Sequence, residues 1–351
     1  MKTIHQIIIG DARDMQGVDS ESIDLVVTSP PYPMIQMWDQ SFCALNPDIG
    51  TYLDSSDGIQ AYELMHRELD RAWDEVYRVL KKGGFACINI GDATRKLGDD
   101  FQLYPNHARI LHYLVALGLQ ILPDILWRKQ TNAPTKFMGS GMLPAGAYVT
   151  LEHEYILIAR KGSKRAFKRD KEKQLRRQSA LFWEERNLFF SDIWTDLKGT
   201  RQILKQDHSR TRSGAFPFEL VFRLICMYSV QQDTILDPFA GTGTTQAAAA
   251  ALCRNSIGVE KESTLLPVIR KTFQNVAGIA NRYHADRLER HREFVRNREK
   301  SKKPLKHCNA NYGFGVMTAQ ETKLLFHDLL KYVELENQVF EVDYVTKIIE
   351  K

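Results

Sequence analysis

The sequence has few cysteines and no long apolar run. Its 351 residues include five cysteines without any Cys-x-x-Cys pair, so neither a zinc site nor a disulfide framework is indicated. No apolar stretch approaches the roughly 20 residues that a transmembrane helix needs. The first ten residues also lack the pattern of a signal peptide. We therefore expect no metal site, no membrane association and a cytoplasmic location.

The remaining composition is that of a folded protein, with 43% hydrophobic and 26% charged residues. The length allows one sizeable α/β domain and a smaller lobe. The net charge of +5 is unevenly spread: residues 161–177 contain nine Lys or Arg, and residues 287–306 are also basic. Such runs are commonly solvated faces. Beside a nucleic-acid site, however, they would neutralise phosphates.

The first informative motif is Thr28-Ser29-Pro30-Pro31-Tyr32, which follows the apolar residues 25–27. The two prolines cannot continue a sheet or donate a backbone N–H. The segment therefore predicts a stiff turn after a buried strand, with a hydroxyl and an aromatic ring available to a ligand. A proline-stiffened loop without any ligand would fit this short string equally well.

A second motif, residues 237–245, reads Asp-Pro-Phe-Ala-Gly-Thr-Gly-Thr-Thr between an apolar run and an alanine-rich run. This order predicts a strand, a glycine turn and a helix. Gly241 and Gly243 would let a ligand approach the backbone, and the helix start would favour an anionic group. Glu260 ends the next apolar stretch, where a carboxylate suits a ribose diol.

Together the two motifs resemble the amino-methylating DNA methyltransferases, which transfer a methyl group from S-adenosylmethionine to an exocyclic amine of a base. The resemblance implies an α/β, Rossmann-like methyltransferase fold with a mostly parallel twisted sheet flanked by helices. The catalytic motif precedes the cofactor motif, as in the β arrangement, where target recognition lies between them. Protein glutamine methyltransferases have the opposite order, and cytosine C5 methyltransferases need a Pro-Cys pair that this sequence lacks.

The same resemblance implies the site residues. The catalytic loop would be Ser29, Pro30, Pro31 and Tyr32. The cofactor site would comprise Asp11, Phe216, Pro217, Asp237, Phe239, Gly241, Gly243, Thr244 and Glu260. In that site Asp11 would accept a hydrogen bond from the adenine amino group, although an acid there would also fit a turn cap. The pair at 216–217 would lie against the cofactor, although a proline also suits a plain helix start.

The implied domains are a catalytic half at 1–160, a target-recognition region at 161–207, a cofactor-binding half at 208–282 and a charged, mostly helical C-terminal extension at 283–351. Apolar spacing predicts helices over 61–80, 106–117 and 218–228. Residues 33–58 read as an irregular excursion over the site.

In the resembled family, serine at the first loop position usually accompanies N4 of cytosine, whereas Asp or Asn accompanies N6 of adenine. The leading hypothesis is therefore a site-specific methyltransferase forming N4-methylcytosine in double-stranded DNA on a flipped-out base. It would be the modification half of a restriction system whose endonuclease acts separately. The methyltransferase itself would be a monomer or a homodimer. N6-adenine methylation, RNA methylation and a DNA-binding protein with a degenerate methyltransferase core are the alternatives.

Overall fold

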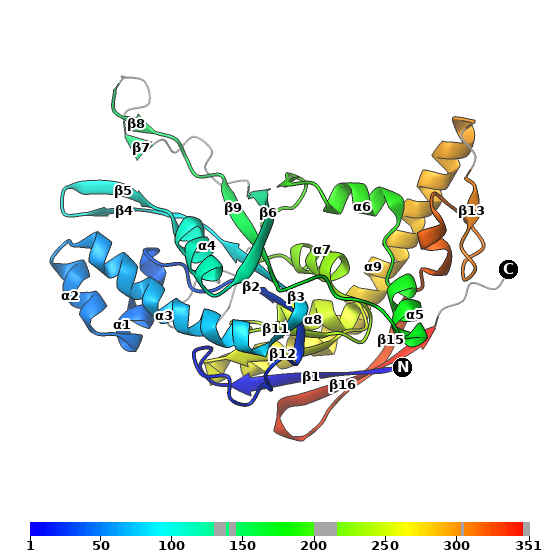
Figure 1. The fold of residues 1–351 in the computed structure, drawn as a ribbon, viewed down its shortest axis with the longest axis horizontal. Helices are drawn as coiled ribbons and strands as arrows, with labels where there is room; N and C mark the ends of the chain where they lie inside the picture. The colour runs from blue at the N-terminus through cyan, green and yellow to red at the C-terminus, as the bar shows by residue number, and fades with distance from the viewer. Residues whose placement is uncertain (130–137, 140–144, 200–215, 303–304, 347–351) are drawn as a thin grey trace.

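The computed structural model describes residues 1–129, 138–139, 145–199, 216–302 and 305–346 (Figure 1). Its main feature is a ten-stranded sheet in the order β10-β6-β9-β3-β2-β11-β12-β1-β16-β15. The strands are β1 (Lys2–Ile9), β2 (Ile23–Thr28), β3 (Leu80–Ile90), β6 (Leu119–Arg128), β9 (His153–Lys161), β10 (Ile193–Trp194), β11 (Thr234–Asp237), β12 (Asn255–Glu260), β15 (His327–Glu334) and β16 (Val339–Thr346).

The centre of this sheet is parallel. Strands β3, β2, β11, β12 and β1 all run in one direction, and β9 is antiparallel to both β3 and β6. The chain leaves β2 towards β3 on one side and leaves β11 towards β12 on the other, so the topological switch point lies between β2 and β11. Ligands of open α/β sheets bind at such a point. The predicted α/β fold with a mostly parallel sheet is confirmed.

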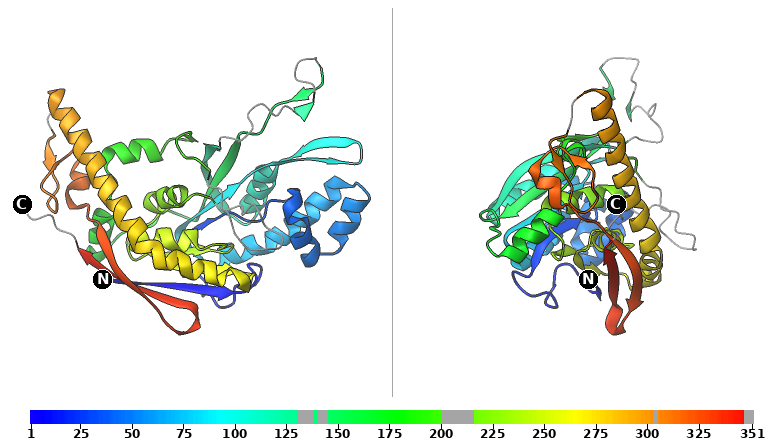
Figure 2. Two further views of the ribbon diagram at one scale, coloured as in Figure 1. Left: turned by 180° about the vertical axis from the view of Figure 1, so that it is seen from behind. Right: turned by 90° about the vertical axis from the view of Figure 1, so that its right-hand side faces the viewer.

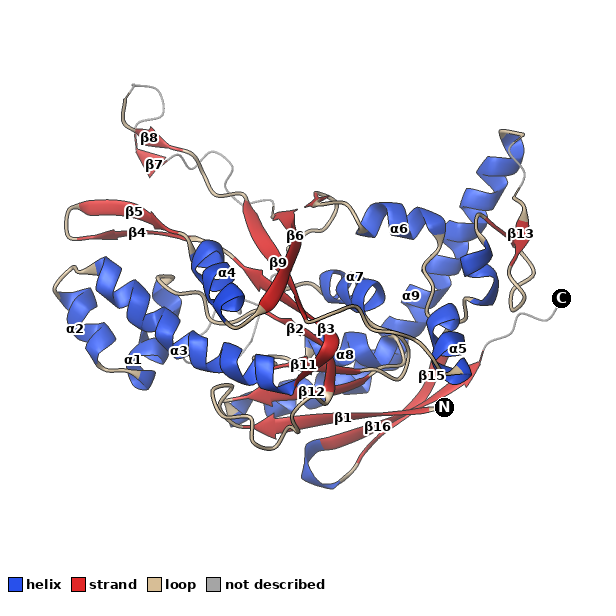
Figure 3. Ribbon diagram, viewed as in Figure 1, coloured by secondary structure: helices blue, strands red, loops and turns tan. Residues whose placement is uncertain are grey.

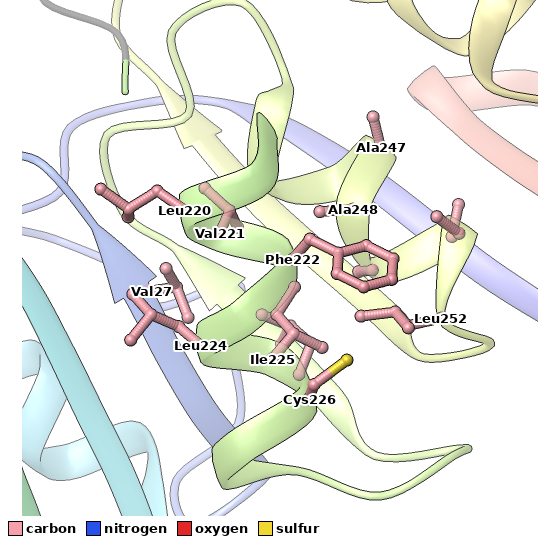
Figure 4. Packing of buried hydrophobic residues seen from close by; sticks show 14 of the residues in the cluster. Val27, Leu220, Val221, Phe222, Leu224, Ile225, Cys226, Ala247, Ala248 and Leu252 are labelled. Atoms are coloured by element: carbon pink, nitrogen blue, oxygen red, sulfur yellow. The ribbon is translucent and has the colours of Figure 1, made fainter. Parts of the chain in front are cut away.

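Helices cover both faces of the sheet (Figure 3). One face carries α7 (Phe218–Tyr228), α8 (Thr244–Ala251) and α9 (Leu266–Lys300), and the other carries α3 (Gly58–Val79) and α4 (Asn106–Ala116). On β2, Leu25 and Val27 belong to the α7 side, whereas Val26 belongs to the α3 side, as the two-residue period of a strand requires. Figure 4 shows Phe222 and Leu252 meeting between α7 and α8. The helices predicted over 61–80, 106–117 and 218–228 are confirmed.

The segment 33–58 differs from the predicted irregular excursion. It forms a short 3-10 turn, η1 (Gln36–Trp38), and two short helices, α1 (Asp39–Leu45) and α2 (Asp48–Asp54). These helices pack on α3 through the fully buried side chains of Phe42 and Ile49. Two small antiparallel sheets follow, β4 (Ala93–Leu97) with β5 (Asp100–Tyr104), and β7 (Met138–Gly139) with β8 (Ala147–Tyr148).

The C-terminal extension is not mostly helical, which corrects that prediction. Helix α9 does continue to Lys300, but β15 and β16 follow, and β16 pairs antiparallel with β1 (Figure 2). Phe340, Val342 and Tyr344 are buried at every second position. The charged residues between them are only partly buried and pair with Lys2, and this alternation is the pattern of a strand rather than of a helix.

A side lobe lies beside the sheet and has a core of its own. It consists of α5 (Asp170–Gln178), α6 (Trp183–Phe189), the end of α9 from residue 284, and residues 305–326. The last of these segments holds β13 (His307–Cys308), β14 (Gly315–Val316) and η3 (Ala319–Lys323). Its buried cluster joins Phe182 to Leu288, Tyr312 and Leu324. The predicted recognition region therefore packs against the C-terminal extension. Residues 200–215, at the predicted boundary between two domains, lie outside the described residues.

Candidate active site at the strand ends

The two sequence motifs meet at the carboxyl ends of β2 and β11, which are neighbours in the sheet. Thr28, the last residue of β2, donates a hydrogen bond from its hydroxyl to Asp237 Oδ1 at 2.7 Å, across 209 positions of sequence. Thr245, in the first turn of α8, donates to Asp237 Oδ2 at 2.6 Å. One carboxylate therefore ties the start of the predicted catalytic loop to the predicted cofactor turn.

Asp237 is 2% exposed. Burial raises the pKa of its carboxyl to about 6, and hydrogen bonds from Thr245, from Thr28 and from the Phe239 backbone N–H limit that rise. Its partners are neutral hydroxyl and amide donors. Because both oxygens accept from protein groups, this carboxylate fixes the shape of the turn.

The glycine turn that follows requires left-handed backbone at two positions. Gly241 has φ +54° and Gly243 has φ +79°, conformations that only glycine adopts at low cost. The Gly241 N–H donates to Glu260 Oε2 at 2.8 Å. A Cβ added at Gly241 would meet only the Phe239 carbonyl oxygen, at 3.9 Å, so the space beside this turn is open. Thr244 is the first residue of α8, and its hydroxyl lies 3.5 Å from that of Thr242.

Two acids stand at the ends of the next parallel strands. Glu260, the last residue of β12, also accepts from the Glu262 N–H at 2.8 Å through Oε1. Asp11 follows β1, where burial tends to raise its pKa. Hydrogen bonds from the Arg13 side chain and backbone outweigh burial and hold that pKa at about 2. Lys261 Nζ lies 3.5 Å from the same carboxylate.

The remaining predicted cofactor residues have structural contacts. Pro217 is the N-cap of α7, as the plain interpretation of a proline at a helix start predicts. Phe216 is buried in the cluster around α7, and Phe239 meets Trp73 edge-on with ring centres 6.2 Å apart.

The predicted catalytic loop is held by a polar cluster that the sequence analysis missed. Tyr32 Oη lies 3.1 Å from Ser29 Oγ and donates to Glu154 Oε2 at 3.0 Å. Asn89 Nδ2 donates to Tyr32 Oη at 2.8 Å and to Glu154 Oε2 at 2.7 Å. Burial, together with the Glu154 charge, raises the pKa of Tyr32 well above 10, so the phenol keeps its proton.

A local signal for this cluster existed in the sequence. Asn89 interrupts the apolar strand 85–90, and two positions later Gly91 provides room for the tyrosine. A Cβ at Gly91 would lie 3.0 Å from Tyr32 Cε2 and 3.3 Å from Glu154 Cγ. Asn89 and Glu154 lie at the same edge of β3 and β9, where only the fold brings them to the loop.

The basic segment divides into structural and exposed cations. Lys161 is buried and donates to the backbone carbonyls of Tyr77 and Leu80. Lys161 therefore contributes to the fold, and it is not part of a solvated face. Arg165 is exposed, although it pairs with Asp233 at 2.8 Å. Four cations on α5 are exposed: Lys171, Lys173, Arg176 and Arg177.

The aromatic residues of the same segment divide similarly. Phe182, Phe189 and Trp194 are buried, whereas Trp183 and Phe190 are 38% and 45% exposed. The packed-core interpretation therefore holds for three of the five rings, and only two are available to a partner.

Within the described ranges, no helix is long and apolar enough to cross a membrane. In the same part of the chain, no three His, Cys, Asp or Glu side chains are grouped so that they could hold a metal ion.

The chain is similar to known proteins in sequence and in fold. The model of the DNA methylase family matches residues 23–271. The chain is 50% identical over 345 residues to the Type II methyltransferase M.MthZI of Methanothermobacter thermautotrophicus, covering 98% of this chain and 96% of that protein. It is also 50% identical over 280 residues to the Type II methyltransferase M.MjaI of Methanocaldococcus jannaschii, covering 77% and 91%.

Among solved structures, the fold is similar to that of a candidate DNA modification methylase from Thermus thermophilus, in complex with S-adenosyl-L-methionine. The two chains are 33% identical with a TM-score of 0.60, over 78% of this chain and 94% of the other.

Proposed function

Because the chain belongs to the DNA methylase family of N6 and N4 amino-methyltransferases, we propose that it methylates N4 of a cytosine flipped out of double-stranded DNA. It is an amino-DNA methyltransferase that uses S-adenosylmethionine. The observation that carries the choice of N4 is Ser29, a hydroxyl at the first position of the loop after β2.

The strand-end residues fit the chemistry of S-adenosylmethionine. Its ribose diol suits the carboxylate of Glu260, and its adenine amino group suits that of Asp11. The open space beside Gly241 and the start of α8 suit the methionine portion with its carboxylate. When bound, the cofactor supplies an electrophilic methyl group.

The catalytic loop would make the amine reactive. An exocyclic amine is a poor nucleophile because its lone pair is delocalised into the ring. The Ser29 hydroxyl and the Pro30 carbonyl would accept the two amino hydrogens and direct the lone pair out of the ring plane. Tyr32 would stack on the flipped base while Pro31 keeps the turn rigid. The rate then comes from positioning and from acceptor dipoles that face developing positive charge.

Target recognition would use the predicted region 161–207 together with the C-terminal extension, since both contribute to the side lobe. The exposed cations of α5 and the exposed rings of Trp183 and Phe190 are suited to phosphate and groove contacts. The names of the two Type II relatives support a place in a restriction-modification system, with an endonuclease that acts separately. The methyltransferase itself would act as a monomer or a homodimer.

Nucleoside analysis tests the proposed target. Duplex DNA is methylated in vitro, digested to nucleosides and examined by mass spectrometry, and we expect N4-methylcytosine. N6-methyladenine as the sole product would overturn the cytosine assignment. Structured RNA serves as a second acceptor, and methylation of RNA in preference to duplex DNA would contradict the DNA substrate. Base-resolution mapping of the same DNA then gives the recognised sequence.

A further inference from the structure

A continuous line of hydrogen bonds leads away from the proposed reacting group. It runs from Ser29 Oγ to Tyr32 Oη over 3.1 Å and from Tyr32 Oη to Glu154 Oε2 over 3.0 Å. The other carboxylate oxygen, Oε1, lies 2.7 Å from Lys129 Nζ. The line crosses the ends of β2 and β9, and its far end is partly open to solvent because Lys129 is about half exposed.

The donors fix the direction of this line. Glu154, paired with Lys129, accepts hydrogen bonds, so the single hydrogen of Tyr32 is directed to it. The Asn89 side chain donates from Nδ2 to both Tyr32 Oη and Glu154 Oε2, because its carbonyl oxygen would be repelled by the carboxylate. The oxygen of Tyr32 then has one acceptor position left, and the hydrogen of Ser29 fills it. The lone pairs of Ser29 are thereby left free for an amino hydrogen of the base.

We propose that Glu154, acting through Tyr32, holds the Ser29 hydroxyl as an acceptor and receives the proton that the methylated amine loses. This proposal rests on the proposed function. Glu154 and Asn89 are positioning residues in it, because they act through Tyr32 and Ser29.

One proton moves from the methylated amine to Glu154, and each hydrogen-bonded group on the way gains one proton and loses one. After methyl transfer the nitrogen is cationic, and its N–H bond breaks with the electron pair remaining on nitrogen. The proton binds Ser29 Oγ, the hydrogen of Ser29 passes to Tyr32 Oη, and that of Tyr32 passes to Glu154 Oε2. A cation and a carboxylate become a neutral methylamine and a carboxylic acid. Loss of the substrate cation is favourable at a partly buried site, where unpaired charge is costly. Lys129 loses its carboxylate partner in this step, but it is about half exposed and stays hydrated.

The test compares Glu154→Gln, Tyr32→Phe and their combination. In Glu154→Gln, Lys129 will attract the amide oxygen, so the NH₂ group faces Tyr32. Tyr32 then accepts a hydrogen bond from residue 154, and the direction of the hydrogen bonds between residues 154, 32 and 29 is reversed. We expect kcat to fall about 10²-fold in each single variant, the low end of what a positioned proton acceptor contributes. The KM values for S-adenosylmethionine and DNA should stay within about threefold. The double variant should be no slower than the slower single variant, because both substitutions interrupt the same chain of hydrogen bonds from Ser29 to Glu154. Glu154→Asp should recover part of the rate.

Two controls separate this role from a loss of folding. Glu152→Gln alters a carboxylate two positions away that pairs with Arg128 instead, and it should keep the rate of the unaltered enzyme. The second control is carbon NMR of protein labelled at the glutamate carboxyl group, without substrate. The resonance missing in Glu154→Gln identifies Glu154, and Tyr32→Phe should shift it.

A kcat within twofold of the unaltered enzyme in Glu154→Gln would overturn the proposal. So would losses that multiply in the double variant, or a Glu154 resonance that Tyr32→Phe leaves in place. The methylated base is identified separately in the unaltered enzyme. A product of N6-methyladenine would refute the cytosine assignment while these rate comparisons still decide the role of Glu154.

Discussion

The strand-end site and the side lobe both bury a carboxylate, but they stabilise it differently. At the site, Asp237 is surrounded by the neutral donors of Thr28 and Thr245. In the lobe, Glu185 faces the Arg287 guanidinium, with two N–O distances of 2.6 and 2.7 Å. The carboxylate of the site shapes a turn, whereas the ion pair of the lobe joins α6 to α9. Changes to the groups of the site that face a ligand should therefore affect binding and chemistry, and loss of the charge partner in the lobe should affect stability.

The largest effect is expected at the site, from Gly241→Val. A β-branched side chain is strongly disfavoured at φ +54°, and it would occupy the space left open beside the turn. We expect calorimetry to detect no binding of S-adenosylmethionine. The matched control is Gly278→Val, at an exposed position of α9 where an added Cβ meets nothing within 4 Å, and it should bind normally. Normal binding by Gly241→Val would show that the cofactor lies elsewhere.

In the lobe, Arg287→Met tests the ion pair. Arg287 is 2% exposed, so its removal leaves the Glu185 charge buried without its guanidinium. Loss of one partner of such a pair costs about 3–5 kcal/mol of unfolding free energy. Urea unfolding should show this loss, while cofactor binding to the folded variant stays normal. Adding Glu185→Gln should restore much of the stability. Loss of cofactor binding below the unfolding transition would instead mean that lobe and site form one cooperative unit.

Ser29→Ala tests whether the Ser29 hydroxyl at the strand-end site acts in the chemical step. Removal of one acceptor that faces developing charge should lower kcat by about 10²–10³, by analogy with the loss of one oxyanion-hole donor. The affinity for S-adenosylmethionine should change by no more than a few-fold, because the hydroxyl acts on the base. The unfolding free energy should also change little, since Ser29 is only partly buried. Full activity would refute the acceptor role.

The difference between the two regions also explains what could be predicted from the sequence. The strand-end motifs are local: each combines an apolar strand with the turn that follows it, so a short stretch carries both structure and chemistry. The sheet and three helices followed from those stretches, and the family that the two motifs resemble implied that residues 28–32 and 237–245 form one site. Asn89 and Glu154 were missed because strand pairing alone brings them to Tyr32.

The side lobe was less predictable because its contacts are distant in sequence. Arg287 looked like part of a basic, solvated run, yet its partner lies 102 positions away on α6. Likewise, β16 was not expected because its partner strand is β1, at the other end of the chain. The charge and aromatic content of residues 161–207 did not reveal which side chains face the core.

The smallest effect, from Asp237→Asn, tests how the site stabilises its carboxylate. The pKa of about 6 in the fold exceeds the ordinary 3.8, so between these values the folded protein keeps a proton that the unfolded chain has lost. The contribution of this group to the unfolding free energy is therefore greatest below pH 4 and falls as the pH rises from 4 to 6. Above pH 6 it is constant, after a total loss of up to about 3 kcal/mol. Asparagine is never charged and can satisfy Thr28 through its oxygen, while the Thr245 hydroxyl turns to accept from its NH₂ group. We expect Asp237→Asn to be more stable than the unaltered protein at pH 7.5 and equal to it at pH 4, in urea unfolding at both pH values. A difference that does not vary with pH would mean that Asp237 is stabilised as a charge, as Glu185 is, and the contrast between site and lobe would disappear.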